Sequence, residues 1–393
     1  MNPSLLSGRR VESDDDWHDL KTLWHIRPDT TYLNHGSFGP SPEPVRGARR
    51  AWLNRCDEQP MDFYVRELEP GLWRSRQAVA RLVGTSPQHL VLMENATAAM
   101  NVVADSFPLR PGDEILLNDH EYGAVHRIWE RRALETGARV VVCRLPLPIE
   151  SADQIVDALV AATSDRTRLL VVSHITSPTA IVMPMNEVTA RFKELGIAIG
   201  VDGPHALAQI DVEIDRMDWD FYCASCHKWL CAPLGTGFLF VHPRWQRHIR
   251  WPIQSWGRLL PAMPERWDEQ FTWTGTRDAS GYLALADAVE FMEQVGLENF
   301  RRRCYWLARE FEQRLVEHTG HRPLAPQDGT WYGTMCHVPL PPGDWSVLQD
   351  DLWRRHGIEV PIVHFDDRWF IRVSSHLYNT VDQIEKLVSC LPR

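Results

Sequence analysis

The sequence predicts an α/β fold: a mostly parallel seven-stranded sheet with flanking helices, followed by a smaller α+β domain. Short apolar runs alternate with amphipathic stretches between residues 89 and 241, as in strands joined by helical crossovers. Runs that are almost continuously apolar indicate strands buried on both faces, which is typical of parallel sheets. The predicted strands are 89–93, 114–117, 140–145, 169–173, 197–201, 221–223 and 237–241.

Length and composition limit the class of protein. The chain has 393 residues, 44% of them hydrophobic, which is enough for a large core and for two domains. A formal net charge of −10 without a basic block argues against nucleic-acid binding. No apolar run approaches about 18 residues, so we expect no membrane span. Residues 1–10 lack a long apolar core, so we expect no signal peptide.

The eight cysteines are scattered, which favours free thiols in a cytoplasmic protein. Cys223 and Cys226 have CxxC spacing, but no second ligand pair accompanies them. We therefore expect no metal site.

Three segments are expected along the chain: an N-terminal segment of residues 1–30, a large domain of residues 31–280 and a small domain of residues 281–393. The small domain is predicted to begin with a long helical stretch, 281–319, and to end with a helix near 381–390. Thr380 and Gln383 give that last helix a capping-box signature.

Lys228 is predicted to be the chemical centre, because it follows a buried strand directly and precedes a glycine-rich turn. Taken alone, it could be a solvated surface lysine. Asp202, however, ends the preceding predicted strand, and the carboxyl ends of neighbouring parallel strands lie together. A lysine for a Schiff base and a carboxylate that keeps a pyridine nitrogen protonated are what a pyridoxal phosphate site requires.

The segments Ser225-Cys226-His227-Lys228-Trp229 and Asp202-Gly203-Pro204-His205 resemble the class V aminotransferase group of fold-type I pyridoxal-phosphate enzymes. Within that group the chain is most similar to the isopenicillin N epimerase branch. The resemblance runs from about Tyr32 to the C-terminus. It implies pyridoxal 5'-phosphate as cofactor, a small amino-acid-type substrate, and an obligate homodimer with active sites at its interface.

Matching the motifs residue by residue implies a phosphate site. Asn95, Ala96 and Thr97 open a helix whose backbone N–H groups suit a phosphate dianion, although Thr97 could simply cap that helix. Ser225 and His227, which flank the lysine, are expected to help hold the phosphate.

The resemblance also implies contacts to the cofactor ring. An aromatic ring or imidazole stacks on the cofactor in the family, and Tyr122 is the aligned residue, with His120 as the competing stacker. Ser177 stands at the position where much of the family has an asparagine that contacts the phenolic oxygen of the cofactor. His205, three residues after Asp202, is expected to lie near the ring.

Substrate contacts are expected from three further regions. Arg372 lies on an apolar strand, where it either forms a buried ion pair or, as the resemblance implies, grips the substrate α-carboxylate. Asn34 and His35 belong to a loop that borders the substrate pocket in the family. Arg66 is either a surface arginine or a ligand for a distal carboxylate in a neighbouring active site, and Thr276 is expected to reach the partner's phosphate.

Several reactions remain open at the α carbon. Between Pro341 and Arg372 there is no cysteine to serve as the mobile thiol of a desulfurase. We favour β elimination of a C–S bond from a cysteine S-conjugate, in a specialised-metabolite or thiol pathway, because it needs Lys228 and a leaving group on the substrate but no second base. Epimerisation is the alternative and needs a donor on the opposite ring face, either Tyr122 or His35. Decarboxylating oxidative deamination, transamination and a cofactor-free binding protein on the same fold are further alternatives.

Overall fold

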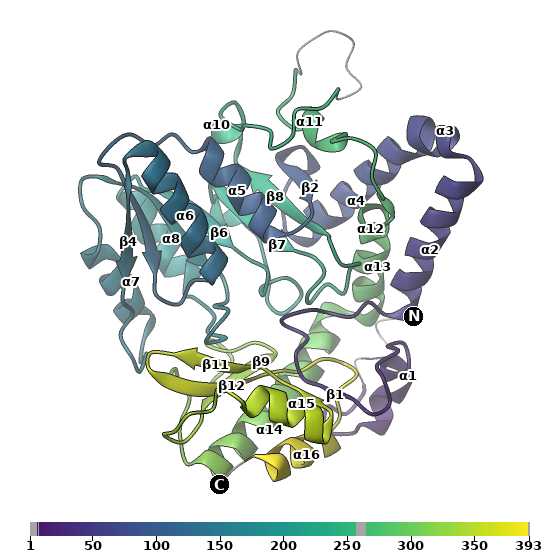
Figure 1. Cartoon of the computed structure of the whole chain (residues 1–393), viewed down its shortest axis with the longest axis vertical. Helices are drawn as coiled ribbons and strands as arrows, with labels where there is room; N and C mark the ends of the chain where they lie inside the picture. Colours follow the sequence, from purple (N-terminus) through teal and green to yellow (C-terminus); the bar gives the residue numbers. More distant parts are fainter. Residues whose placement is uncertain (1–5, 7, 257–264, 392–393) are drawn as a thin grey trace.

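The apolar runs form one seven-stranded sheet at the centre of the large domain (Figure 1). The structure is a computed structural model that describes residues 6, 8–256 and 265–391. The strand order is β2-β8-β7-β6-β5-β3-β4, and β8 alone runs antiparallel to its neighbours. The strands are β2 Leu90–Met93, β3 Glu114–Asn118, β4 Arg139–Cys143, β5 Thr167–Ser173, β6 Ala198–Asp202, β7 Phe221–Ser225 and β8 Gly237–Val241. Each predicted strand is present, and the predicted fold class is confirmed.

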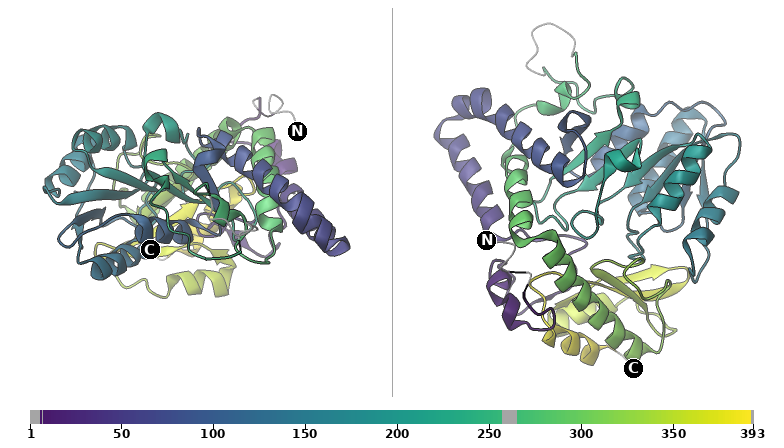
Figure 2. Two further views of the ribbon diagram at one scale, coloured as in Figure 1. Left: turned by 90° about the horizontal axis from the view of Figure 1, so that it is seen from above. Right: turned by 180° about the vertical axis from the view of Figure 1, so that it is seen from behind.

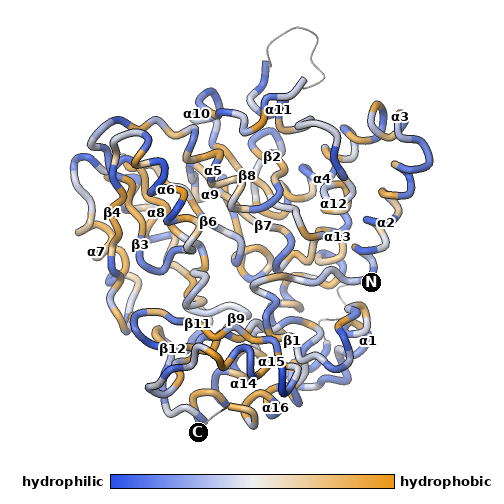
Figure 3. The backbone as a smooth tube through the Cα atoms, in the orientation of Figure 1, coloured by the Kyte–Doolittle hydropathy of each residue, from blue (hydrophilic) through white to orange (hydrophobic). Residues whose placement is uncertain are grey.

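Both faces of this sheet are buried. Successive side chains of a strand point to opposite faces, and each face packs in its own apolar cluster. On β3, Ile115 and Leu117 pack in one apolar cluster and Leu116 in the other. Helices α5 (Ala96–Ser106) and α6 (Gly123–Thr136) cover the first face. Helices α4 (Leu68–Leu82), α7 (Ala152–Ala161), α8 (Met185–Glu194) and α13 (Leu285–Val295) cover the second. The strands accordingly appear in hydrophobic colours in Figure 3. The ends of these apolar runs therefore determine which residues lie at the carboxyl edge of the sheet.

The helices of the large domain connect these strands or pack beside them. Helix α2 projects from the body of the molecule, as the two views of Figure 2 show. The helical segments are η2 Asp15–Trp17, α1 His18–Lys21, α2 Glu43–Glu58, α3 Pro60–Asp62, η3 Phe63–Glu67, α4 Leu68–Leu82, η4 Pro87–His89, α5 Ala96–Ser106, α6 Gly123–Thr136, α7 Ala152–Ala161, α8 Met185–Glu194, α9 Ile214–Met217, α10 Pro243–Gln246, α11 Glu269–Thr272, α12 Ser280–Leu283 and α13 Leu285–Val295.

The small domain lies below the large sheet in Figure 1 and contains a three-stranded antiparallel sheet of order β11-β12-β9. Strand β1, near the N-terminus, pairs in parallel with β10 of this domain. The elements are β1 Thr31–Tyr32, α14 Leu297–Thr319, β9 Met335–Pro339, α15 Leu348–His356, β10 Ile358–Glu359, β11 Ile362–Phe365, β12 Arg368–Ser374 and α16 Asp382–Cys390. The N-terminal chain is therefore built into the C-terminal domain.

The predicted helical stretch 281–319 is divided into α12, α13 and α14. Gly296 separates α13 from α14 with φ of +81°, a conformation that favours glycine. Helix α13 packs on α4 and α2, whereas α14 packs on β9. The domain limits at residues 30 and 280 remain a prediction.

No helix in the described part of the chain combines the length and hydrophobicity that a transmembrane segment needs.

Candidate active site

A cavity of about 390 Å³ lies between the carboxyl ends of the parallel strands and the small domain. In open α/β sheets this is the edge at which ligands bind. The cavity is lined by Asn95, Ala96, Thr97, Tyr122, Ser177, Asp202, His205, Ser225, His227, Lys228 and Arg372. The structure thus brings together most of the predicted site residues, although they come from five strand ends and two domains.

Asp202 ends β6, and Lys228 lies in the turn after the adjacent strand β7, whose Cys223 is paired in register with Asp202. Burial raises the pKa of Asp202 to about 7, an effect that the nearby Lys228 charge opposes. Burial also lowers the pKa of Lys228 to about 8, helped by the charge of Arg372 and opposed by Asp202. The Lys228 amine therefore loses its proton far more readily than an ordinary lysine amine.

His205 supports the same conclusion through its hydrogen bonds. Its Nδ1 accepts from the indole N–H of Trp229 at 3.2 Å. Its Nε2 lies 3.2 Å from Nζ of Lys228. Burial and the neighbouring cations hold the pKa of His205 well below its usual value, so the imidazole is neutral. Because Nδ1 accepts, Nε2 carries the proton and faces the lysine amine, which disfavours the charged form of Lys228.

The N-terminus of α5 forms another wall of the cavity. Asn95 caps this helix by accepting from the backbone N–H of Ala98 at 2.8 Å, so the cap is Asn95 and not Thr97. The backbone N–H of Ala96 donates to Ser225 Oγ at 3.0 Å, which links the helix start to the strand that carries Lys228. Backbone N–H groups and hydroxyls in this arrangement suit an anionic group.

Tyr122 reaches the cavity from the loop after β3, where it precedes α6, and its side chain is 50% exposed. His120 is buried instead, with Nδ1 2.7 Å from the hydroxyl of Thr179, and it does not line the cavity. Between the two predicted stackers, the geometry therefore favours Tyr122.

Glu121 is a buried carboxyl group that sequence reasoning missed. It accepts hydrogen bonds from Ser173 at the backbone N–H (2.8 Å) and at the hydroxyl (2.6 Å), and from the amide of Asn118. Burial raises its pKa to about 8 despite these hydrogen bonds. Glu121 thereby fastens the loop that carries Tyr122 to the end of β5. The only signal in the sequence is an acid directly before the tyrosine, which no periodicity distinguishes.

Arg372 enters the cavity from β12 of the small domain. Its Nη1 donates to the Ser177 carbonyl, and Nη2 donates to Ser37 Oγ at 3.3 Å. Burial lowers its pKa to about 10, so the side chain remains a cation at neutral pH. Its Nε is buried and has no partner among the described residues. An unpaired guanidinium N–H at the cavity is a suitable donor for a carboxylate.

Four predicted residues lie outside the cavity. Asn34 donates to Glu359 at 3.1 Å, and His35 is fully buried behind the lysine loop. Arg66 forms an ion pair with Asp62 and is largely exposed, and Thr276 is also exposed. Their predicted contacts with substrate or with a partner's phosphate remain predictions.

All eight cysteines are free thiols, as expected from the sequence. Cys223 and Cys226, the CxxC pair, are buried, and burial raises the pKa of both thiols. Neither residue lines the cavity.

Acid should destabilise the protein because His35 and His174 are buried as neutral imidazoles. Burial lowers the pKa of His35 to about 3 and that of His174 to about 4, whereas an unfolded histidine titrates near ~6.5. Their contribution to stability is therefore complete above pH ~6.5 and is lost as the pH falls toward ~4. The thermal unfolding midpoint should drop across this window, and His174→Gln should make the drop shallower. A midpoint that stays constant would contradict this reasoning.

Comparisons with known proteins agree with this geometry. A family described as aminotransferase class-V matches residues 64–387. An isopenicillin N epimerase of Amycolatopsis lactamdurans is 37% identical over 95% of this chain and 98% of its own. A putative L-cysteine desulfhydrase of Oryza sativa subsp. japonica is 30% identical over 98% of this chain and 85% of its own. A solved cystine C–S lyase, in complex with cysteine persulfide, superimposes with a TM-score of 0.81 at 22% identity, covering 92% of this chain and 97% of that one.

Proposed function

The chain belongs to the aminotransferase class-V family of pyridoxal-phosphate-dependent enzymes, and we propose that it inverts the α carbon of an amino-acid substrate. The observation that carries this proposal is one cavity holding a lysine of lowered pKa, a buried aspartate and a tyrosine, with an arginine for the carboxylate. The isopenicillin N epimerase at 37% identity favours inversion over other reactions of the family. The sequence alone favoured C–S elimination over epimerisation. The epimerase relative reverses this order.

The side chains of the cavity fit pyridoxal 5'-phosphate. The start of α5, with Thr97 and Ser225, offers donors for the phosphate. Asp202 lies buried at the strand end, where it would hold the proton of the pyridine nitrogen, and Lys228 would bind the aldehyde. When bound, the cofactor withdraws electrons from the substrate α carbon and so makes its proton acidic.

Arg372 and Lys228 would do the first part of the work. The unpartnered Nε of Arg372 and its Nη2 would bind the substrate carboxylate and orient the Cα–H bond. The lowered pKa of Lys228 would suit its amine to act as the base that takes up the α proton.

Inversion also needs a proton donor on the opposite face, and Tyr122 is our candidate. The tyrosine lines the same cavity as Lys228 but comes from β3 and not from β7. His35, the other predicted donor, is buried away from the cavity. The phenol would then return a proton to the face from which Lys228 does not reach.

A second, larger cavity supports a substrate that extends beyond a simple amino acid. It measures about 1020 Å³ and shares Ser37 and Phe38 with the site. Large apolar side chains lie open in it, with Phe38 64% exposed and Leu234 61% exposed. Such surfaces mark binding sites. We propose that the side chain of the substrate extends into this cavity.

A C–S β-lyase is the second candidate. The desulfhydrase at 30% identity favours it, and Lys228 with Asp202 would suffice for elimination. In both functions we propose a homodimer. The exposed residues Arg66 and Thr276 would act in the partner's active site, as the sequence suggested.

Tyr122→Phe separates the two candidates, because phenylalanine keeps the aromatic ring and removes the proton. In heavy water, the wild type should return an inverted aminoadipyl-peptide substrate with one deuterium at Cα. The variant should invert it about 10²–10⁴-fold more slowly while still exchanging the α proton through Lys228. Chiral chromatography with mass spectrometry measures both. Inversion at the wild-type rate by the variant would exclude Tyr122, and pyruvate with free thiol from S-substituted cysteines would establish the lyase.

A further inference from the structure

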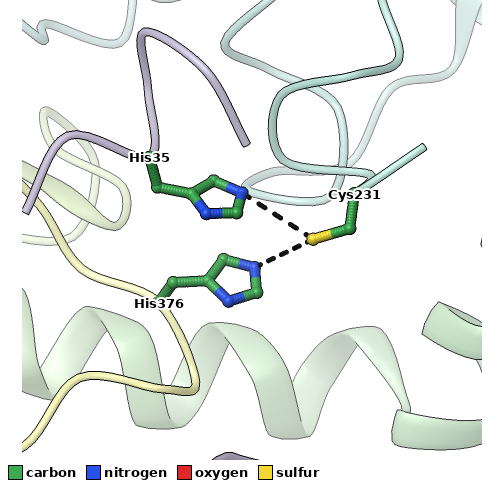
Figure 4. Close-up of side chains that lie close together, drawn as sticks. All are labelled: His35, Cys231 and His376. Atoms are coloured by element: carbon green, nitrogen blue, oxygen red, sulfur yellow. Dashed lines mark hydrogen bonds between the residues drawn. The ribbon is translucent and has the colours of Figure 1, made fainter. Parts of the chain in front are cut away.

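Three buried side chains that do not line the cavity meet close to the backbone of Lys228: His35, Cys231 and His376 (Figure 4). The sulfur of Cys231 lies 3.7 Å from His35 Nε2 and 3.4 Å from His376 Nε2. Two imidazoles and a thiol at such separations have the composition of a zinc site. The hydrogen bonds of His35, however, point to a different function.

His35 is already committed at both ring nitrogens. Its Nε2 lies 3.1 Å from the backbone carbonyl oxygen of Lys228, and its Nδ1 lies 2.9 Å from the Tyr378 hydroxyl. A carbonyl oxygen only accepts, so Nε2 carries the proton and Nδ1 accepts from the phenol. A protonated nitrogen has no lone pair for a metal. The imidazoles of His35 and His376 are also stacked, 3.9 Å apart and 12° from parallel, so their lone pairs do not converge on one ion.

The loop that carries His35, residues 34–40, makes further contacts with the backbone around the lysine. Gly39 donates its N–H to the carbonyl of His227 at 3.1 Å. A Cβ at Gly39 would lie 2.4 Å from the carbonyl oxygen of Lys228, so only glycine permits this approach. The carbonyl of Lys228 also accepts from the backbone N–H of Cys231 at 2.9 Å. Two donors therefore hold the peptide group of the lysine.

The same loop is fastened to the strand that carries Arg372. Asn34 forms a parallel bridge with Ser374, two residues beyond Arg372. Ser37 Oγ accepts from Arg372 at 3.3 Å. Tyr378, the partner of His35, follows the same strand. One loop therefore contacts both the lysine of the large domain and the arginine of the small domain.

We propose that His35 is a positioning residue: by donating to the Lys228 carbonyl, it sets the distance between the lysine amine and the carboxylate held by Arg372. The inference rests on the proposed roles of Lys228 and Arg372. A shift of the lysine by about 1 Å is enough to cost roughly 10²-fold in rate. Burial lowers the pKa of His35 to about 3, so near neutral pH the imidazole stays neutral and its Nδ1 keeps accepting from Tyr378 while Nε2 donates to Lys228.

The test uses three substitutions in the holoenzyme. The amide of His35→Gln can donate from the position of Nε2, whereas the shorter His35→Asn and His35→Ala cannot reach the Lys228 carbonyl. We expect Gln to keep kcat close to the wild-type value, and Asn and Ala to lower kcat about 10- to 100-fold with KM little changed. His174→Gln is the matched control, since His174 is also buried and bonded to a tyrosine, at 3.1 Å. It should keep kcat.

Three measurements separate the possible failures. Visible absorbance of the wild-type protein shows whether the cofactor is bound. If this absorbance is absent, the proposed function is overturned together with the positioning role. Equal kcat for the Gln and Ala variants, with bound cofactor, would overturn the positioning role alone. Elemental analysis should find no stoichiometric zinc, and Cys231→Ser should keep kcat. Stoichiometric metal whose removal lowers kcat as much as His35→Ala does would establish the metal site instead.

Discussion

Lys228→Ala should reduce turnover by at least about 10³-fold and abolish the visible absorbance of the bound cofactor. The side chain would supply both the covalent bond to the cofactor and the base for the α proton, and each role has its own large effect on rate. The variant should retain the fold, because a buried amine with a lowered pKa is a cost to stability and not a support. Steady-state kinetics with absorbance spectra measure the effect.

Lys193→Ala is the matched control, because Lys193 lies on the surface and pairs with Asp218 at 2.6 Å. It should keep the spectrum and the turnover of the wild type. Turnover of Lys228→Ala within tenfold of the wild type would remove the lysine from the chemistry.

Asp202→Asn should lower kcat/KM roughly 10²–10⁴-fold, corresponding to about 3–5 kcal/mol for breaking a buried charge pair. The asparagine keeps the shape of the side chain but loses the charge that would hold the pyridine proton. In the cofactor-free protein Asp202→Asn should not lower stability, and should raise it above neutral pH. Because burial raises the pKa of Asp202 to about 7, the ionised carboxylate costs stability above that pH.

Thermal unfolding of cofactor-free protein at about pH 8 tests this sign. Asp202→Asn should melt at or above the wild-type temperature. Asp268→Asn is the control for a structural buried acid, since Asp268 pairs with Arg76 at 2.7 Å. That variant should melt lower while kcat/KM is preserved. Lower melting of Asp202→Asn without loss of kcat/KM would make Asp202 a structural residue.

The sequence predicts the large domain well because its strands are buried on both faces. An apolar run such as Leu169–Ser173 can be recognised without knowledge of its neighbours, and polar residues mark its end. The small domain is harder to predict. Strand β1 pairs with β10, from the other end of the chain, and Asn34 pairs with Ser374. No local pattern records contacts over such separations.

The same distinction applies to the site. Asp202 ends a strand, and Lys228 and Thr97 come shortly after strands. Their position at the carboxyl edge of the sheet could therefore be inferred from the order of strands along the chain. Whether a side chain faces the cavity depends on tertiary contacts. His35 stands two residues before Ser37, which lines the cavity, yet its side chain is turned toward the backbone of Lys228. Glu121 was missed for the same reason.

Borohydride reduction of the holoenzyme followed by peptide mass spectrometry tests the central claim most directly. Reduction converts the bond between lysine and cofactor into a stable amine, which marks the modified residue with the mass of the cofactor. The chain has four lysines, Lys21, Lys193, Lys228 and Lys386, so the assignment is unambiguous. We expect the reduced cofactor on the peptide containing Lys228 and on no other. Cofactor on another lysine, or on none, would contradict it.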